Sequence, residues 1–116
     1  MARSFGYAFE GLALLLRSQP NFCIQIAAAA AAVGLAVLLE MSRTEVAILV
    51  LTAGLVLSLE ATNTALESLC DLVSPSYHPL VKRAKDISAA AVLLTAIAAL
   101  AVAILLFAPY LLRNRG

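Results

Sequence analysis

Five polar side chains recur at helical spacing in the middle of the sequence. They are Glu60, Asn63, Thr64, Glu67 and Asp71. At about 100° per residue, all five fall within an arc of roughly 100° on one face of a helix. Carboxylates are oxygen donors suited to Mg²⁺, which proteins usually hold through one or two of them together with the phosphates of a substrate. This face therefore predicts a site for a metal ion and a phosphate.

A basic group is also expected near this face, because three carboxylates on one side of a helix repel each other. Lys85 and Asp86 precede the next apolar segment and can reach the acidic face from there. Acid, metal, phosphate and lysine together are the parts of a phosphoryl-transfer site. The glycine-rich phosphate loops of soluble nucleotide-binding folds are absent from the sequence, so ATP would bind in a different kind of site.

The composition requires a membrane around this site. The chain has 116 residues, of which 63% are hydrophobic and 13% are charged, and its mean hydropathy is +0.98. A soluble domain of this size cannot bury so much apolar surface, and a disordered chain would be more polar. The formal net charge of +1 and the lack of a basic block argue against a nucleic-acid partner. We therefore expect residues 1–116 to form one integral membrane domain.

Three apolar segments are long enough to cross a bilayer, which takes roughly 20 residues of helix. They are residues 22–40, 46–72 and 86–112. Residues 4–17 carry large apolar side chains mostly on one side, which predicts an amphipathic helix lying in the interface. The expected fold is an all-α membrane protein with three transmembrane helices and one N-terminal surface helix.

Basic residues indicate the orientation, because cytoplasmic segments are enriched in Lys and Arg. Three spans put the N-terminal segment and the linker 74–86 on the same side, which carries Arg3, Arg17, Lys82, Arg83 and Lys85. The other side carries Arg43, Arg113 and Arg115. We expect the first side to be cytoplasmic, so that the acidic helix end faces the compartment that contains ATP.

Glu60 is expected at the edge of the bilayer. The apolar stretch 46–59 is too short to span by itself, so a complete span must bring Glu60 to the boundary. An alternative is that the helix has simply left the bilayer and exposes a solvated acidic face.

The same residues resemble a known family, the prokaryotic diacylglycerol kinases, which include the undecaprenol kinases. Residues 60–71 are similar to the family signature E-x-x-N-S/T-A-I/L-E-x-x-x-D. The likeness continues through residues 77–80 and 84–92, and residues 4–11 are a weaker match to the N-terminal helix. The resemblance covers nearly the whole chain.

This resemblance implies a lipid kinase that depends on ATP and Mg²⁺. The family works as a homotrimer in the bacterial inner membrane, with cytoplasmic N-termini and with active sites between subunits. The lipid alcohol would be undecaprenol or diacylglycerol, and residues 77–80 look more like the undecaprenol branch.

The resemblance also implies roles for individual residues. Glu60 would be the base that takes the proton from the lipid hydroxyl, and Asn63 would arrange the polar centre. Glu67 would bind the metal, and Gln19 stands where the family usually has a second metal-binding Glu. The residues expected to bind the nucleotide are Lys85, Asp86, Asp71, Tyr77, His78 and Arg3, of which Arg3 would replace a basic residue found elsewhere in the family.

Two other hypotheses stay open. A small membrane transporter would also carry a membrane carboxylate, but it would need four spans and an acid in the middle of a helix. A catalytically silent relative of the kinases would keep the fold, and the neutral Gln19 motivates that alternative. Tyr77 and His78 could also be plain turn residues.

Overall fold

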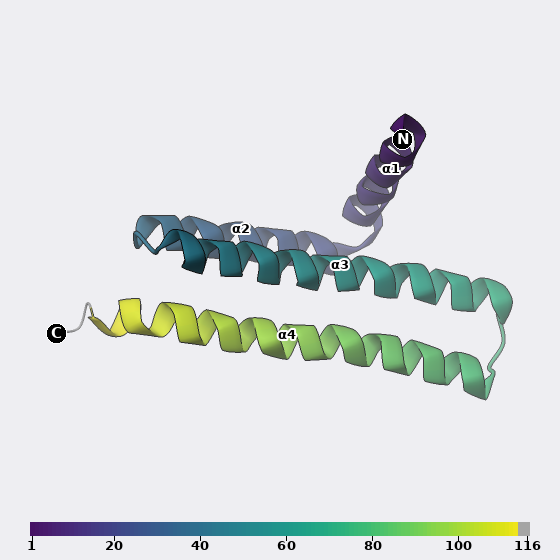
Figure 1. The fold of residues 1–116 in the computed structure, drawn as a ribbon. Coiled ribbons are helices and arrows are strands. Elements are labelled where there is room, and N and C mark those ends of the chain that lie inside the picture. The colour runs from purple at the N-terminus through teal and green to yellow at the C-terminus, as the bar shows by residue number, and fades with distance from the viewer. Residues whose placement is uncertain (114–116) are drawn as a thin grey trace.

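The computed structural model describes residues 1–113, which form four helices. They are α1 (Ala2–Ser18), α2 (Pro20–Leu38), α3 (Arg43–Val73) and α4 (Pro79–Arg113) (Figure 1). Helices α2, α3 and α4 are long and apolar enough to cross a membrane. The prediction of an all-α membrane protein with three spans and a separate N-terminal helix is therefore confirmed. Arg115, counted in the charge balance above, lies outside the described residues.

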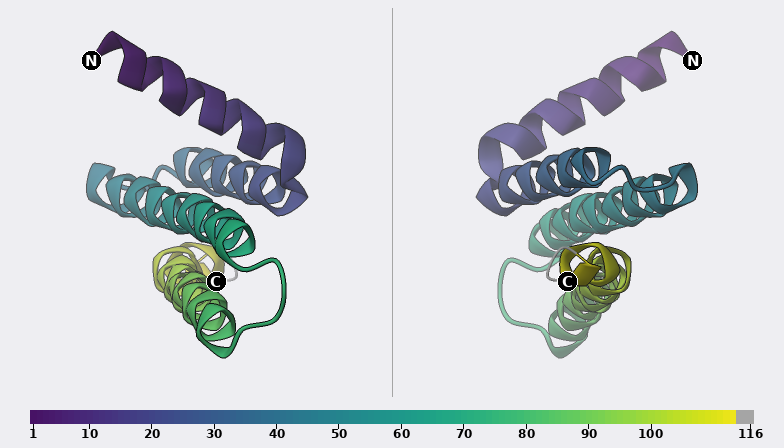
Figure 2. Two further views of the ribbon diagram at one scale, coloured as in Figure 1. Left: turned by 90° about the vertical axis from the view of Figure 1, so that its right-hand side faces the viewer. Right: turned by 90° about the vertical axis from the view of Figure 1, so that its left-hand side faces the viewer.

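Helix α3 is the middle helix of the three spans. It packs against α2 on one side and against α4 on the other, and α4 runs antiparallel to it along its length (Figure 1). Helix α1 crosses over α2 and α3 on the side away from α4 and diverges from them toward its N-terminus (Figure 2). Alanine-rich stretches in α2 and α4 allow close approach of the backbones, as is usual in membrane bundles.

A tight turn joins α2 to α3. The amide of Met41 donates to the carbonyl of Ala36 at 3.0 Å, and the amide of Glu40 donates to the carbonyl of Val37 at 3.1 Å. This is the hydrogen-bond pattern that ends a helix with one residue in the left-handed region. That residue is Glu40, with a φ of 56°. Met41 and Ala36 are both buried in one apolar cluster, which stabilises the turn.

The start of α3 is tied to the end of α4. Ser42 and Glu45 form a reciprocal capping box, which satisfies free amides of the first turn of α3. The hydroxyl of Tyr110 donates to Oε1 of the same Glu45 at 2.6 Å, and the guanidinium of Arg113 lies over the Tyr110 ring. One end of the helical layer is therefore fixed by a turn, a cap and a cross-helix hydrogen bond.

Helix lengths indicate where the bilayer ends. Helix α2 has 19 residues, which is about 28 Å and close to the thickness of the hydrocarbon core. Helices α3 and α4 have 31 and 35 residues, about 46 and 52 Å at 1.5 Å per residue. Because α2 and α3 run antiparallel from the tight turn, the additional length extends beyond the start of α2 (Figure 1). Glu60 lies near that level, and Asp71 lies roughly 16 Å further along α3.

The orientation can be tested by labelling cysteines introduced at the two ends of the layer. Thr44 and Ser76 are both exposed, in the first turn of α3 and in the linker before α4. Both native cysteines are free and would first be replaced by alanine. We expect Thr44→Cys to react with an impermeant maleimide added to intact bacteria, and Ser76→Cys to react only after permeabilisation. The reverse pattern would contradict a cytoplasmic linker.

Candidate functional site

The side chain of Glu60 is held from the neighbouring helix α2. Nε2 of Gln25 donates to Oε1 of Glu60 at 3.0 Å, and both residues are half-buried. The hydroxyl of Thr64 donates to the backbone carbonyl of Glu60 at 3.0 Å, within the same helix. The predicted base therefore lies at the contact between α2 and α3.

Glu67 accepts a hydrogen bond from Asn63, and Asn63 is in turn held by Ser88 of α4. The hydroxyl of Ser88 in α4 donates to Oδ1 of Asn63 at 2.6 Å, and Nδ2 of Asn63 donates to Oε1 of Glu67 at 3.3 Å. Because Ser88 occupies the amide oxygen of Asn63, the amide nitrogen is directed toward Glu67. The chain from Ser88 through Asn63 to Glu67 thus fixes the orientation of a neutral amide beside a carboxylate.

Two ion pairs lie at the outer ends of α3 and α4. Lys85 pairs with Asp71 across the two helices, as the repulsion between acidic residues predicted. Asp86 pairs instead with Lys82 of its own helix, at 2.6 Å. Both pairs are substantially exposed, so solvent screens them and each contributes little to stability. These side chains can therefore exchange partners at little cost in folding.

A hollow of about 330 Å³ lies between these ion pairs and the linker. Its lining combines charged side chains with residues of the linker: Asp71, Ser74, Pro75, Ser76, Tyr77, His78, Val81, Lys82 and Lys85. Nδ1 of His78 accepts a hydrogen bond from the amide of Leu80 at 3.1 Å, so His78 also caps the start of α4. Tyr77 and His78 are both exposed. Four of the six residues expected to bind the nucleotide line the hollow: Asp71, Tyr77, His78 and Lys85. A fifth, Asp86, follows Lys85 directly in the sequence.

Arg3 and Gln19 are not brought to this cluster within one chain. Arg3 is exposed near the outer end of α1, the helix that projects from the bundle (Figure 1). Gln19 lies at the junction of α1 and α2, where its backbone ends one helix and begins the next. Within residues 1–113, neither side chain bonds to an acidic residue of α3.

Sequence reasoning missed Gln25 and Ser88 as members of the site. Each had a signal, because each is one of few polar side chains in an otherwise apolar span. A polar side chain at membrane depth needs a partner and marks a functional position. The spacing of residues within α3 was enough to predict its polar face. Gln25 and Ser88 lie on other helices, so spacing within one helix could not connect them to that face.

The donor set suits Mg²⁺ held with the help of a substrate. Residues 1–113 contain no cluster of three or more His, Cys, Asp or Glu side chains able to enclose a metal ion. Mg²⁺ does not need such a cage, since it commonly keeps several waters and binds one or two carboxylates plus phosphate oxygens. Glu67 is exposed and has Asn63 beside it, so it can supply one such carboxylate. The residues present therefore fit the ion.

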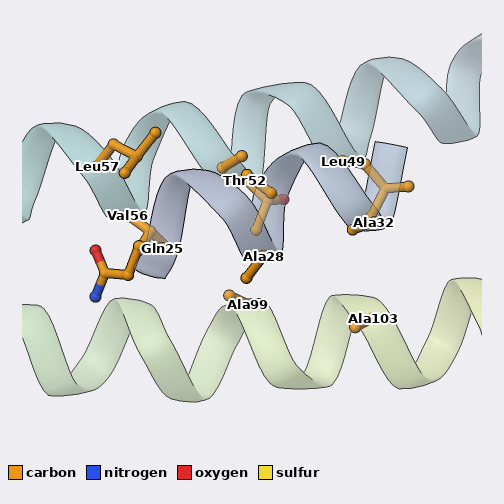
Figure 3. A pocket seen from close by; sticks show the side chains of 11 residues that line it. Gln25, Ala28, Ala32, Leu49, Thr52, Val56, Leu57, Ala99 and Ala103 are labelled. Atoms are coloured by element: carbon orange, nitrogen blue, oxygen red, sulfur yellow. The ribbon is translucent and has the colours of Figure 1, made fainter. Parts of the chain in front are cut away.

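An apolar groove of about 190 Å³ lies among α2, α3 and α4, and Gln25 stands at one end of it (Figure 3). Small side chains line most of the groove, including Ala28, Ala32, Ala99 and Ala103. Oε1 of Gln25 is buried and has no hydrogen-bond partner in the described part of the chain. The polar cluster of α3 therefore adjoins an apolar space inside the membrane layer.

Together these features define an all-helical membrane protein with an acidic polar site in the C-terminal half of its second membrane helix. Comparison with known proteins gives the family. The model for the prokaryotic diacylglycerol kinases matches residues 6–107. The chain belongs to the prokaryotic diacylglycerol kinase family, a family of lipid kinases.

Individual relatives carry two different names. The chain is 48% identical over 110 residues to a diacylglycerol kinase of Synechocystis sp., covering 94% of this chain and 63% of that protein. It is 38% identical over 109 residues to the undecaprenol kinase of Bacillus subtilis, covering 94% of this chain and 89% of the relative. It is 32% identical over 97 residues to the diacylglycerol kinase of Escherichia coli K12, covering 84% of this chain and 80% of the relative. The chain thus spans less than two thirds of the Synechocystis protein.

The hydrogen bond from Ser88 to Asn63 can be tested by its contribution to stability. Ser88→Ala leaves Oδ1 of Asn63 without its donor, and we expect a loss of about 0.5–1.5 kcal/mol in the free energy of unfolding. Ser68→Ala is the matched control, because the Ser68 hydroxyl donates only to a carbonyl of its own helix. Reversible unfolding in mixed micelles measures both. Equal losses for the two variants would contradict a cross-helix role for Ser88.

Proposed function

We propose that this protein is an ATP- and Mg²⁺-dependent kinase that transfers the γ-phosphate of ATP to the hydroxyl of a membrane lipid alcohol. The observation that carries the proposal is the position of Glu60. This carboxylate lies near the expected level of the bilayer edge, on the same helix as Asp71, which lines the hollow together with Lys82 and Lys85 of α4. A lipid hydroxyl at the interface and a nucleotide in the hollow would thus approach the same face of α3.

Glu60 acts as the general base. It takes the proton from the lipid hydroxyl while the hydroxyl oxygen forms a bond to the γ-phosphorus of ATP. The bond from that phosphorus to the β,γ-bridging oxygen breaks, ADP leaves, and the phosphorylated lipid remains in the membrane. Glu60 then releases its proton to water. Such a base contributes about 10²–10⁴-fold to the rate.

Lys85 binds the phosphates of ATP, which means exchanging Asp71 for an anionic ligand. The exposed, weak pair between these residues makes that exchange inexpensive. Asp71, Asp86, Tyr77 and His78 complete the nucleotide site around the hollow. Asn63 orders the polar centre between Glu60 and Glu67.

Glu67 would hold the Mg²⁺ that accompanies ATP, and Gln19 would be a weaker second ligand because a neutral amide attracts the ion less than a carboxylate does. When bound, the ion neutralises charge on the transferred phosphate. The protein residues need only hold Glu67 in place, which the bond from Asn63 does.

The enzyme works as a homotrimer with sites between subunits. Within residues 1–113, neither Arg3 nor Gln19 forms a hydrogen bond or ion pair with the acidic face of its own chain, and the N-terminal end of α1 lies away from the other helices (Figure 1). A neighbouring subunit could therefore receive these residues from α1 and its junction with α2. We place the trimer in the bacterial inner membrane with the N-terminus in the cytoplasm, following the distribution of basic residues.

The lipid is undecaprenol or diacylglycerol. Relatives named for each are similar over most of this chain. Both alcohols present a hydroxyl at the interface, and Glu60 accepts a proton from either.

Replacing the base tests the mechanism. Glu60→Gln keeps the size of the side chain and a hydrogen-bonding group for Gln25, so we expect the fold to persist while kcat falls about 10²–10⁴-fold. Glu10→Gln is the control, since Glu10 is an exposed acid of α1. Transfer of labelled phosphate from ATP to lipid in micelles gives the rates.

Retention of the wild-type rate by Glu60→Gln would refute the assignment of the base. A wild-type protein that is inactive and gains activity only on Gln19→Glu would instead support a catalytically silent relative. Proton-coupled uptake of a solute without use of ATP would support the transporter.

A further inference from the structure

Gln25 is the only amide side chain in the apolar stretch of α2 that begins at Phe22. Between Phe22 and Leu39 every other side chain is apolar or a single thiol. Removing an amide from water is unfavourable unless hydrogen bonds replace the lost solvent. Polar residues at membrane depth accordingly mark functional positions. The question is what this amide does there.

Only one half of the amide is satisfied. Nε2 donates to Oε1 of Glu60 at 3.0 Å, whereas Oε1 of Gln25 is buried without a partner in the described residues. Figure 3 shows the amide at the end of the apolar groove, with alanines of α4 opposite. An apolar side chain of the same length would pack there without leaving a buried acceptor unpaired. Packing therefore does not account for an amide at this position.

The donor half has a defined effect on Glu60. The amide nitrogen of Gln25 on α2 donates a hydrogen bond to one carboxylate oxygen of Glu60 on α3. This hydrogen bond holds the carboxylate in one orientation. Within residues 1–113, the other oxygen of Glu60 accepts no hydrogen bond from the protein. A general base works only when its free oxygen is within hydrogen-bond reach of the proton it takes, and small misplacements are costly.

We propose that Gln25 is a positioning residue for the phosphoryl transfer. Its amide holds one oxygen of Glu60 so that the second oxygen faces the lipid hydroxyl. This inference rests on the proposed function, since it assumes that Glu60 is the base. It adds a residue of the first membrane helix to a reaction otherwise carried by the second and third.

The test replaces Gln25 by methionine, which keeps the length of the side chain and removes both amide groups. The full-length protein in lipid micelles is assayed with labelled ATP. Active sites are counted by equilibrium binding of a non-hydrolysable ATP analogue. We expect kcat per nucleotide-binding site to fall roughly 10- to 100-fold, as for lost alignment of a reacting group. The KM for ATP should stay within about twofold, because the hollow lies further along α3.

Thr52→Val is the matched control. Thr52 lines the same groove, and its hydroxyl donates only within α3, to the carbonyl of Ile48. We expect this variant to keep the wild-type kcat. A loss equal to that of Gln25→Met would show a general effect of the groove and would overturn the proposal.

A double variant separates positioning from an independent effect. If Gln25 acts through Glu60, adding Gln25→Met to Glu60→Gln should cause no further loss of turnover, measured over long incubations. If the double variant instead lost turnover by the product of the two single losses, the proposal would be overturned. A kcat within about twofold of wild type for Gln25→Met alone would also overturn it.

Two further outcomes are distinguishable. If Gln25→Met does not bind the nucleotide analogue, Gln25→Leu is used instead, because it also removes the amide donor and adds no charge beside Glu60. A wild-type kcat in Gln25→Leu would then overturn the proposal, and a loss would support it. A wild-type protein that transfers no phosphate would refute the proposed function itself, and the role of Gln25 would fall with it.

Discussion

A carboxylate at the edge of a bilayer is stable only where protein or water supplies a hydrogen-bond donor or an opposite charge. The polar face of α3 carries the carboxylates of Glu60, Glu67 and Asp71, and each of them has a partner. Glu60 is held by an amide of α2, Glu67 by an amide of its own helix, and Asp71 by a lysine of α4. The partners of Glu60 and Asp71 come from α2 and α4, the two helices between which α3 packs.

The partners change with distance from the membrane. Near the level where α2 begins, the donors are neutral amides, and further along α3 and α4 they become charged and exposed. Neutral donors suit a region of low dielectric constant, where a full counter-charge would itself need solvation. The opposite end of the layer is closed by the turn at Glu40 and by the bond from Tyr110 to Glu45. One end of the molecule is thus fixed, and the other carries the hollow and the polar residues.

Spacing within a single helix could be read from the sequence. The acidic face of α3 was predicted because residues on one helix have a known angular relation, and the three spans were predicted because the bilayer sets their length. Gln25 and Ser88 could not be assigned, since one sequence does not give the register between helices. Helix α4 begins at Pro79, ahead of the predicted span 86–112, because the charged turn 82–86 continues the helix although it is not apolar. The metal, the trimer and the nucleotide stay predictions from the resemblance.

Phosphate transfer by the purified wild-type protein tests the central claim most directly. The protein in micelles would be given ATP labelled at the γ-phosphate, with diacylglycerol or undecaprenol, and with or without Mg²⁺. The account predicts that label appears in at least one lipid and that its appearance requires Mg²⁺. Label released only as inorganic phosphate, or none transferred with either lipid, would contradict it.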